Sequence, residues 1–190
     1  ITKFIKPKIK SLFEKKSSKT EENLWATCGC KNLIYKEDLL SNQKVCPKCG
    51  AHHKLTCRER FKTFFDNKEF ELIETPLPKD DPLGFVDSKP YKERLKSARK
   101  KTGLKCSMVV ATGSINNIKI TAIASDFDFL GASIEAAEGE AILFAAQYSI
   151  ENKQPLLICT SGGGMRMQDS MISLSQMPRS ILAINELKKH

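Results

Sequence analysis

Hydrophobic and polar positions in the second half of the chain predict a β-hairpin. Two β-rich runs, 107–115 and 118–127, flank the pair Asn116-Asn117, and adjacent asparagines favour a tight turn. The composition changes to this pattern at about Cys106. We therefore expect the main domain to cover residues 105–190.

A helix and a further strand follow the hairpin. Residues 134–152 place Ala, Glu, Leu and Phe at helical spacing, and the apolar run 156–159 is typical of a short buried strand. Three glycines come next, and helical spacing then continues through Met165, Met167, Met171, Leu174 and Met177. The order strand, strand, helix, strand, helix predicts an α/β core in layers with helical crossovers.

Residues 58–104 predict a mostly helical connector. A helix is expected over 56–70, where three phenylalanines share an apolar face and core packing is their default role. The stretch 71–89 is rich in proline and aspartate, as connecting segments are. A charged helix is then expected over 91–101, with Gly103 as its stop signal.

Length and composition describe an ordinary globular protein. The 190 residues suffice for one domain and a small module, and the hydrophobic and charged contents are 41% and 28%. No apolar run approaches the roughly 20 residues that span a bilayer, and no secretory signal pattern is visible. Because the first residue is Ile1 rather than Met, we expect the natural start to be missing.

The net charge of +9 favours an acidic partner, which leaves nucleic acid, an acidic protein and a phosphate-bearing cofactor open. A solvated Lys-rich surface without a partner is the common alternative. Residues 1–23 form a Lys-rich arm with apolar residues on roughly one helical face, interrupted by Pro7. The arm fits contact with a membrane surface or a partner, and equally a solvated extension.

Four of the seven cysteines are clustered between positions 28 and 49 and predict a zinc ribbon over residues 24–57. The ligands expected are Cys28, Cys30, Cys46 and Cys49, two pairs separated by a hairpin-length insert, as tetrahedral zinc requires. His52 and His53 are substitutes if one cysteine does not reach the metal. Clustered thiols also indicate a reducing compartment. So small a module is expected to depend on its metal for stability.

Two glycine-containing turns are the candidate catalytic elements: Gly131 with Ala132, and Gly162, Gly163 and Gly164. Each is expected to follow a strand and lead into a helix. Glycines allow close backbone approach, and the N–H groups of a first helical turn can bind an anion or an oxyanion. The second turn lacks the P-loop ending. A turn that only joins two core elements remains the plain alternative.

Several motifs occur in one order along the chain. They are Trp25, Val45-Cys46-Pro47-Lys48-Cys49 with His52-His53, Asp87-Ser88-Lys89 with Tyr91, Arg94 and Leu95, Ser161-Gly162-Gly163, Arg166-Met167-Gln168, Ser173-Leu174 and Gln176-Met177. This ordered set resembles the β subunits of acetyl-coenzyme A carboxylase carboxyltransferase of the bacterial and plastid type. The resemblance covers nearly the whole chain from Trp25 onward.

The resemblance implies a crotonase-like α/β fold, here its N-terminal part, preceded by a zinc ribbon. It implies transfer of a carboxyl group from carboxybiotin, carried by the biotin carboxyl carrier protein, to acetyl-CoA, which gives malonyl-CoA for fatty acid synthesis. Backbone N–H groups would stabilise enolate-like oxygens on the thioester and on biotin. The implied partners are a carboxyltransferase α subunit in an α2β2-type assembly and biotin carboxylase, with ATP binding, in the bacterial cytoplasm or the plastid stroma.

This sequence departs from the family pattern at four points. The first knuckle is Cys28-Gly29-Cys30, one residue short, and Gly164-Met165 replaces a single alanine. Ala132 stands where a second glycine is frequent. The chain also ends in a helix that no later strand covers, so we expect a truncated domain that is inactive by itself. The alternative function is a zinc-ribbon protein that binds nucleic acid.

Overall fold

The structure, a computed structural model, describes residues 24–190. The predicted basic arm over residues 1–23 lies outside the described residues. The chain divides into two compact units between His53 and Lys54. We call residues 24–53 the ribbon unit and residues 54–190 the sheet unit. Among the described helices, none has both the length and the hydropathy needed to cross a membrane.

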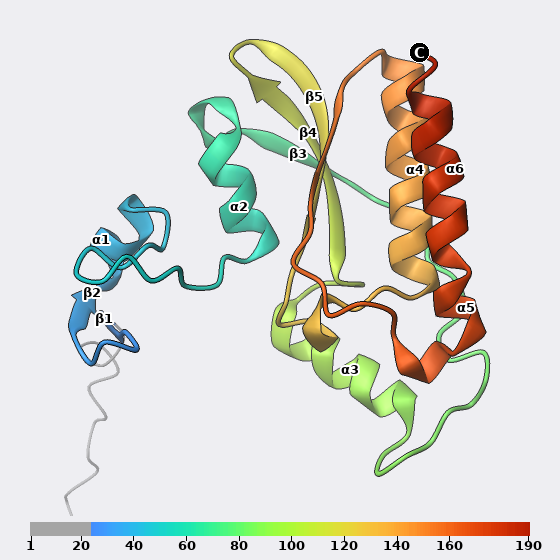
Figure 1. The fold of residues 1–190 in the computed structure, drawn as a ribbon, viewed down its shortest axis with the longest axis horizontal. Helices are drawn as coiled ribbons and strands as arrows, with labels where there is room; N and C mark the ends of the chain where they lie inside the picture. The colour runs from blue at the N-terminus through green and yellow to red at the C-terminus, as the bar shows by residue number, and fades with distance from the viewer. Residues whose placement is uncertain (1–23) are drawn as a thin grey trace, which may run out of the picture. The chain divides into compact units, whose positions relative to one another are not determined.

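The ribbon unit is a small two-stranded sheet followed by one short helix (Figure 1). β1 (Trp25–Thr27) pairs antiparallel with β2 (Leu33–Tyr35), and α1 (Lys36–Ser41) follows. Four buried side chains form its core, and two of them are cysteines: Cys28, Ile34, Leu39 and Cys46. Since hydrophobic burial is so limited, this unit needs a further source of stability.

The sheet unit contains one four-stranded sheet with helices on both faces (Figure 1). The strands lie in the order β3 (Phe70–Ile73), β4 (Met108–Ile115), β5 (Ile118–Ser125) and β6 (Leu156–Cys159). The first two pairings are antiparallel and the last is parallel. The helices are α2 (Cys57–Phe64), α3 (Tyr91–Thr102), α4 (Ala136–Asn152), α5 (Met171–Leu174) and α6 (Gln176–Leu187), with 3-10 turns η1 (Asp66–Lys68), η2 (Leu130–Ala132) and η3 (Met167–Asp169).

The predicted hairpin is confirmed as β4 and β5. Asn116 and Asn117 connect the strands, and both adopt the left-handed conformation, with φ of 51° and 64°. Two such residues in succession match the right-handed twist of a hairpin. The Asp66 carboxylate accepts hydrogen bonds from both backbone N–H groups, at 3.0 Å and 2.9 Å. A residue of η1 therefore holds the turn that the two asparagines form.

The two faces of β5 pack against different helices. Ala122 and Ala124 belong to the cluster that contains Phe61 of α2, whereas Ile123 belongs to the cluster that contains Ala141 of α4. This alternation follows from the two-residue period of a strand. Small residues on one face let α2 approach closely, and the crossover helix α4 covers the other face.

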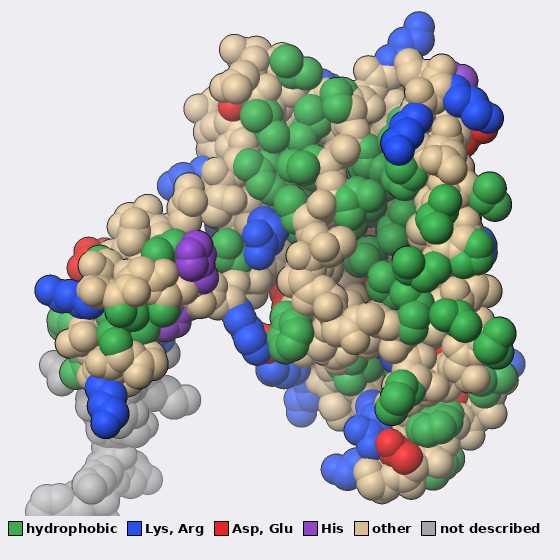
Figure 2. Space-filling model, viewed as in Figure 1, with side chains coloured by type: hydrophobic (Ala, Val, Ile, Leu, Met, Phe, Trp, Pro, Cys, Tyr) green, Lys and Arg blue, Asp and Glu red, His purple; other side chains and the backbone are tan. Residues whose placement is uncertain are grey.

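α4 and α6 run side by side (Figure 1). Gly139 allows this approach, because a Cβ atom there would collide with the side chain of Gln176. The outer side of α6 leaves Met177, Ile181 and Leu182 exposed, and Figure 2 shows apolar side chains at the surface over α5 and α6.

The prediction of a helix over 56–70 is correct for its first half and wrong beyond it. α2 begins after Thr56, whose side chain accepts from the Glu59 N–H while the Glu59 carboxylate accepts from the Thr56 N–H. The helix ends at Phe64, and Phe70 begins β3, an edge strand of the sheet. The expected helical connector therefore contributes a strand to the sheet. The helix expected over 91–101 is confirmed as α3, and Gly103 ends it at φ 70°.

The helix expected directly after the glycine turn is also wrong. Gly164 is followed by extended backbone, and Met165 forms a parallel bridge with Ile134. Helical structure begins only with η3 and α5. The physical reason is the burial of Arg166, whose interactions hold this segment extended, as shown below.

Candidate active site and metal centre

Four cysteine sulfurs converge in the ribbon unit. The Sγ atoms of Cys28 and Cys49 are 3.6 Å apart, those of Cys30 and Cys46 are 4.0 Å apart, and all four lie within 4.8 Å of one another. Zinc–sulfur bonds of about 2.3 Å in a tetrahedron place neighbouring sulfurs about 3.8 Å apart. The predicted ligands thus have the spacing of a zinc site, and the short Cys-x-Cys knuckle does not prevent it.

Neighbouring groups shift the pKa values of two of these thiols in opposite directions. The backbone and side-chain N–H groups of Asn32 lower the pKa of Cys30 to about 6, and the side-chain bond is 3.2 Å long. The Ala51 backbone N–H lowers the pKa of Cys49, but the neighbouring sulfurs outweigh it and raise this pKa to about 12. Four thiolates so close together repel one another unless a divalent ion compensates them. Within the described chain, neither His52 nor His53 joins this cluster.

The two predicted glycine turns lie against each other in the sheet unit. The Gly163 N–H donates to the Gly131 carbonyl at 2.8 Å, and the Ile134 N–H donates to the Gly164 carbonyl at 2.8 Å. The approach at Gly162 is equally close, because an added Cβ would lie 2.8 Å from the Ala132 carbonyl oxygen. The structure thus brings all five predicted residues into one backbone cluster.

The backbone N–H groups of this cluster fall into two classes. Ala132 donates to Phe129, and Gly163 donates to Gly131, so neither N–H is free. Within residues 24–190, the N–H groups of Gly131, Gly162 and Gly164 donate no hydrogen bond. The three glycines of the second turn are exposed. Uncommitted donors on exposed glycine backbone can bind an oxyanion.

Left-handed backbone conformations shape both turns. Gly131 and Ala132 have φ of 68° and 50°, and Gly164 has φ of 89°. The alanine Cβ makes this conformation costly, so its neighbours must hold it. The second turn is held at its start, where the Ser161 N–H donates to Ser125 Oγ at 2.6 Å.

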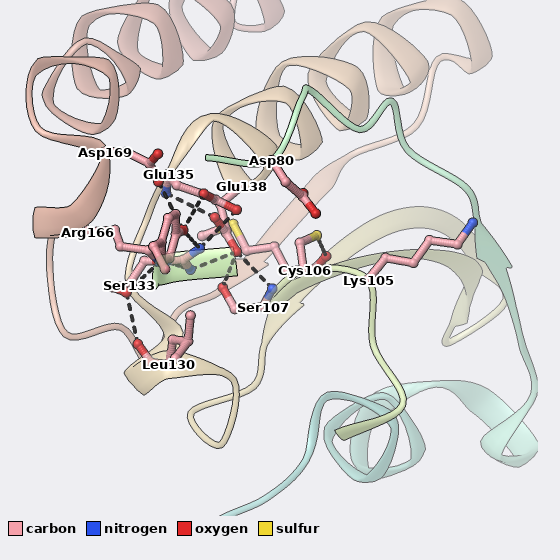
Figure 3. Close-up of polar contacts among 12 residues, drawn as sticks. Asp80, Lys105, Cys106, Ser107, Leu130, Ser133, Glu135, Glu138, Arg166 and Asp169 are labelled. Atoms are coloured by element: carbon pink, nitrogen blue, oxygen red, sulfur yellow. Dashed lines mark hydrogen bonds and ion pairs between the residues drawn. The ribbon is translucent and has the colours of Figure 1, made fainter. Parts of the chain in front are cut away.

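A buried ion cluster involves residues that follow the two turns in the sequence (Figure 3). The Arg166 guanidinium, 1% exposed, lies 2.9 Å from Glu135 and 3.2 Å from Glu138. It also donates to the Ser133 carbonyl at 2.6 Å and to Ser133 Oγ at 3.0 Å. Arg166 follows the second turn, and Ser133 follows the first. One side chain therefore connects the two turns through the protein interior.

Glu135 and Glu138 are held at the start of α4. The Glu135 N–H donates to Glu138 Oε2 at 2.9 Å, in a reciprocal cap of the helix. The other Glu138 oxygen accepts from the backbone N–H and the hydroxyl of Ser107, both at 2.8 Å. Carboxylates are favourable here because the helix N-terminus is the positive end of its dipole.

Tyr91 closes the cluster from α3. Its hydroxyl lies 2.6 Å from Glu135 Oε2 and 3.0 Å from Asp169 Oδ2, and it accepts from Arg166 at 3.0 Å. Burial and the hydrogen bond with Asp169 raise the pKa of Glu135 to about 7, although Arg166 and Tyr91 act in the opposite direction. Burial disfavours the Arg166 charge, but Glu138 and Glu135 outweigh it and raise the pKa of Arg166. The cluster therefore keeps its cation.

Sequence reasoning missed this cluster as a unit. Tyr91 and Arg166 are in the motifs that carry the family resemblance, but the sequence did not show that they meet. Glu135 and Glu138 give a signal, because two carboxylates three residues apart open an otherwise apolar helix. The remaining contacts join residues that are far apart in the sequence, so no local pattern predicts them.

Two known protein families match this chain. A family model described as "Carboxyl transferase domain" matches residues 54–189, well over half of the chain. The chain belongs to the carboxyl transferase family. A second family, "Acetyl-CoA carboxylase zinc finger domain", matches residues 25–49 and includes the four clustered cysteines. The ribbon of this carboxyl transferase chain thus resembles a carboxylase zinc finger, which gives the nucleic-acid alternative no support.

Curated relatives carry the name acetyl-coenzyme A carboxylase carboxyl transferase subunit beta. The protein of Pelagibacter ubique is 56% identical over 185 residues, which cover 96% of this chain and 60% of the relative. That of Liberibacter asiaticus is 42% identical over 189 residues, which cover 99% of this chain and 66% of the relative. The chain therefore spans about three fifths to two thirds of the length of these relatives.

Solved structures share the fold of the carboxyl transferase chain. A Pseudomonas malonate decarboxylase hetero-tetramer matches with a TM-score of 0.51 and 20% identity, over 71% of this chain and 47% of that chain. Transcarboxylase 12S matches with a TM-score of 0.51 and 20% identity, over 68% of this chain and 23% of that chain. The predicted crotonase-like α/β fold with an N-terminal zinc ribbon is confirmed.

Proposed function

We propose that this chain is part of the β subunit of an acetyl-CoA carboxylase carboxyltransferase, which moves a carboxyl group from carboxybiotin to acetyl-CoA and gives malonyl-CoA. The observation that carries the proposal is the pair of glycine turns, whose backbones lie in direct contact and keep three N–H donors uncommitted among the described residues. The family match and the relatives' names supply the reaction class.

The chemistry that this reaction needs suits a backbone site. When the methyl carbon of acetyl-CoA loses a proton, negative charge develops on the thioester oxygen. The N–H groups of Gly162 and Gly164, or of Gly131, donate to an oxygen of this kind, on the thioester or on biotin. The nearby carboxylates are bonded to Arg166 and Tyr91 inside the protein, so their role is structural. The acceptor of this proton is the biotin anion that remains when the N–C bond of carboxybiotin breaks, and the CO2 so released forms the new C–C bond with the methyl carbon.

Zinc is assigned to the ribbon unit. Cys28, Cys30, Cys46 and Cys49 would hold one ion and so supply the stability that the small apolar core lacks. CoA phosphates suit the positive net charge of the chain, although no particular lysine or arginine is assigned.

The assembly extends beyond this chain. The proposed partners are a carboxyltransferase α subunit, in an α2β2-type complex, the biotin carboxyl carrier protein and biotin carboxylase. ATP binding belongs to this proposal as well. The place of action is the bacterial cytoplasm, or the plastid stroma in a plastid lineage.

Reconstitution tests the function. The complete gene product is co-expressed with an α subunit, and malonyl-CoA formation from acetyl-CoA and carboxybiotin is measured. We expect turnover, and we expect Gly163→Val to abolish it while the assembly persists. Absence of turnover with the unaltered complex contradicts the function, and unaltered turnover of Gly163→Val contradicts the oxyanion site.

A salt titration addresses the nucleic-acid alternative. Phosphate contacts give an affinity that falls steeply with salt concentration. We expect no such slope for this chain on single-stranded or double-stranded DNA. A steep slope, together with absence of carboxyl transfer, would support the alternative function.

A further inference from the structure

We propose that Arg166, Tyr91, Glu135 and Asp169 form a positioning cluster that fixes the two glycine turns against each other and thereby sets the spacing of their N–H donors. The proposal rests on the proposed function for its effect on turnover. It assigns a task to charged side chains that the reaction itself does not use.

Arg166 joins the segments that follow the two turns. The backbone N–H of Arg166 donates to the Ile134 carbonyl at 2.9 Å, and its guanidinium donates twice to Ser133. Arg166 is two residues from Gly164, and Ser133 is two residues from Gly131. A displacement of the guanidinium therefore moves one turn relative to the other. No other side chain in the described part of the sheet unit donates to the Ser133 carbonyl.

The cluster contains more acidic groups than basic ones. Glu135 and Glu138 share the Arg166 guanidinium, Asp169 shares the Tyr91 hydroxyl with Glu135, and all three carboxyl groups are buried. Burial of unpaired charge is strongly unfavourable, so the cluster is stable only if a proton reduces the excess. Ser107 satisfies Glu138, and the excess therefore falls on Glu135 and Asp169.

The Tyr91 hydroxyl contacts two carboxyl groups. Its hydroxyl has one proton, yet it lies within hydrogen-bond distance of Glu135 and of Asp169. Only one carboxyl group can accept that proton. A proton on Glu135 lets its carboxyl group donate as well, so the arrangement favours the protonated form of Glu135. The raised pKa of Glu135, about 7, agrees with this count.

Other charged groups surround Glu135. α3 contributes Tyr91 and, farther away, Arg99, and α4 contributes Glu138. The segment after the second turn contributes Arg166 and Asp169, and Cys106 lies within electrostatic range. Burial and Glu138 raise the pKa of Cys106 to about 12, so this thiol stays neutral. Among these groups, the one whose pKa lies near neutral pH is therefore Glu135.

The test compares three variants with matched controls in the complete complex. Tyr91→Phe removes the hydroxyl that Glu135 and Asp169 share, and Glu135→Gln removes the carboxyl group that titrates. Arg166→Lys keeps the positive charge but removes the branched guanidinium. Tyr148→Phe and Glu140→Gln are the controls, since both residues lie on α4 outside the cluster. Turnover is divided by the folded fraction, which circular dichroism and thermal unfolding supply.

We expect Tyr91→Phe and Arg166→Lys to lower kcat about tenfold to a hundredfold, because small displacements of positioned groups cost that much. The KM for acetyl-CoA should change less than twofold. We also expect the ratio of the Glu135→Gln kcat to the wild-type kcat to rise with pH through about 7, because only the wild type loses its proton there. If Arg166→Lys does not fold, Tyr91→Phe and Glu135→Gln still test the positioning cluster.

The proposal would be overturned if the ratio of the Glu135→Gln kcat to the wild-type kcat stayed constant between pH 6 and pH 8.5 and the kcat of Tyr91→Phe were unaltered. Amide hydrogen exchange at Gly162 to Gly164 separates this failure from a failure of the function. Faster exchange there in Tyr91→Phe, but not in Tyr148→Phe, supports the positioning cluster even if the complex forms no malonyl-CoA. Equal exchange in the two variants argues against it.

Discussion

At the scale of single residues, backbone groups and the atoms that a glycine lacks determine the candidate site. Gly162 passes the Ala132 carbonyl so closely that no Cβ fits without a displacement of backbone. Gly163 is less restricted, since its added Cβ would lie 3.2 Å from the Gly131 oxygen. The two positions therefore differ in their tolerance of alanine.

Gly162→Ala should lower kcat about tenfold or more, because the second turn must move away from the first. Gly163→Ala should have a smaller effect. Malonyl-CoA formation by the reconstituted complex measures both.

Gly84→Ala is the control for loss of a glycine. Gly84 has φ of 63° in open surroundings, so alanine there adds only backbone strain of about 1 kcal/mol. Urea unfolding should show that loss while kcat stays at the wild-type value. An equal kcat in Gly162→Ala would contradict the close contact of the turns.

At the scale of elements, the sequence predicted those whose local signals agree with their surroundings. The hairpin at Asn116-Asn117 and the long helix α4 are examples, since turn residues and apolar spacing settle them. β3 was missed because Phe70–Ile73 is short and follows a helical pattern, and because its identity depends on pairing with β4. Tertiary pairing of this kind leaves no local signal.

The glycine turn illustrates the other kind of miss. Helical spacing from Met165 to Met177 predicted a helix directly after Gly164, and the five site residues were predicted together with it. The residues do meet, but Arg166 is drawn into the interior and keeps the backbone extended. The long-range partners of one charged side chain here outweigh the local pattern.

The ribbon unit should depend on its metal. Trp25 is the only tryptophan of the chain, and its ring lies 5.6 Å from the Tyr35 ring across β1 and β2. Removal of zinc by a chelator should change the tryptophan fluorescence, while the sheet unit keeps its circular dichroism because its own apolar clusters hold it.

Metal analysis accompanies this measurement. We expect about one zinc ion per chain, lost in Cys46→Ser and retained in Cys159→Ala, whose thiol lies on β6. Zinc retained at full content in Cys46→Ser would contradict the four-cysteine site.

At the scale of the whole molecule, the buried cluster makes stability depend on pH. Glu135 has a pKa of about 7 in the folded chain, above the ordinary value of 4.5, so the folded state binds the proton more tightly. Its contribution is therefore greatest below pH 4.5 and is lost as the pH rises to about 7. The difference corresponds to about 3 kcal/mol.

Urea unfolding at pH 5 and pH 8 measures this dependence. The free energy of unfolding should fall more between these values in the wild type than in Glu135→Gln, which does not titrate. Glu151→Gln, an exposed position on α4, should behave like the wild type. If the free energy of unfolding depends on pH in the same way in the wild type and in Glu135→Gln, the raised pKa of Glu135 is refuted.

The contact between the two turns has a consequence for mutagenesis. The candidate donors are main-chain amides, and the residues that carry them have almost no side chain to remove. A scan that truncates side chains would therefore pass over this site and report the ion cluster instead. The site responds to the addition of atoms, so a scan with successively larger residues at Gly162, Gly163 and Gly131 would outline it.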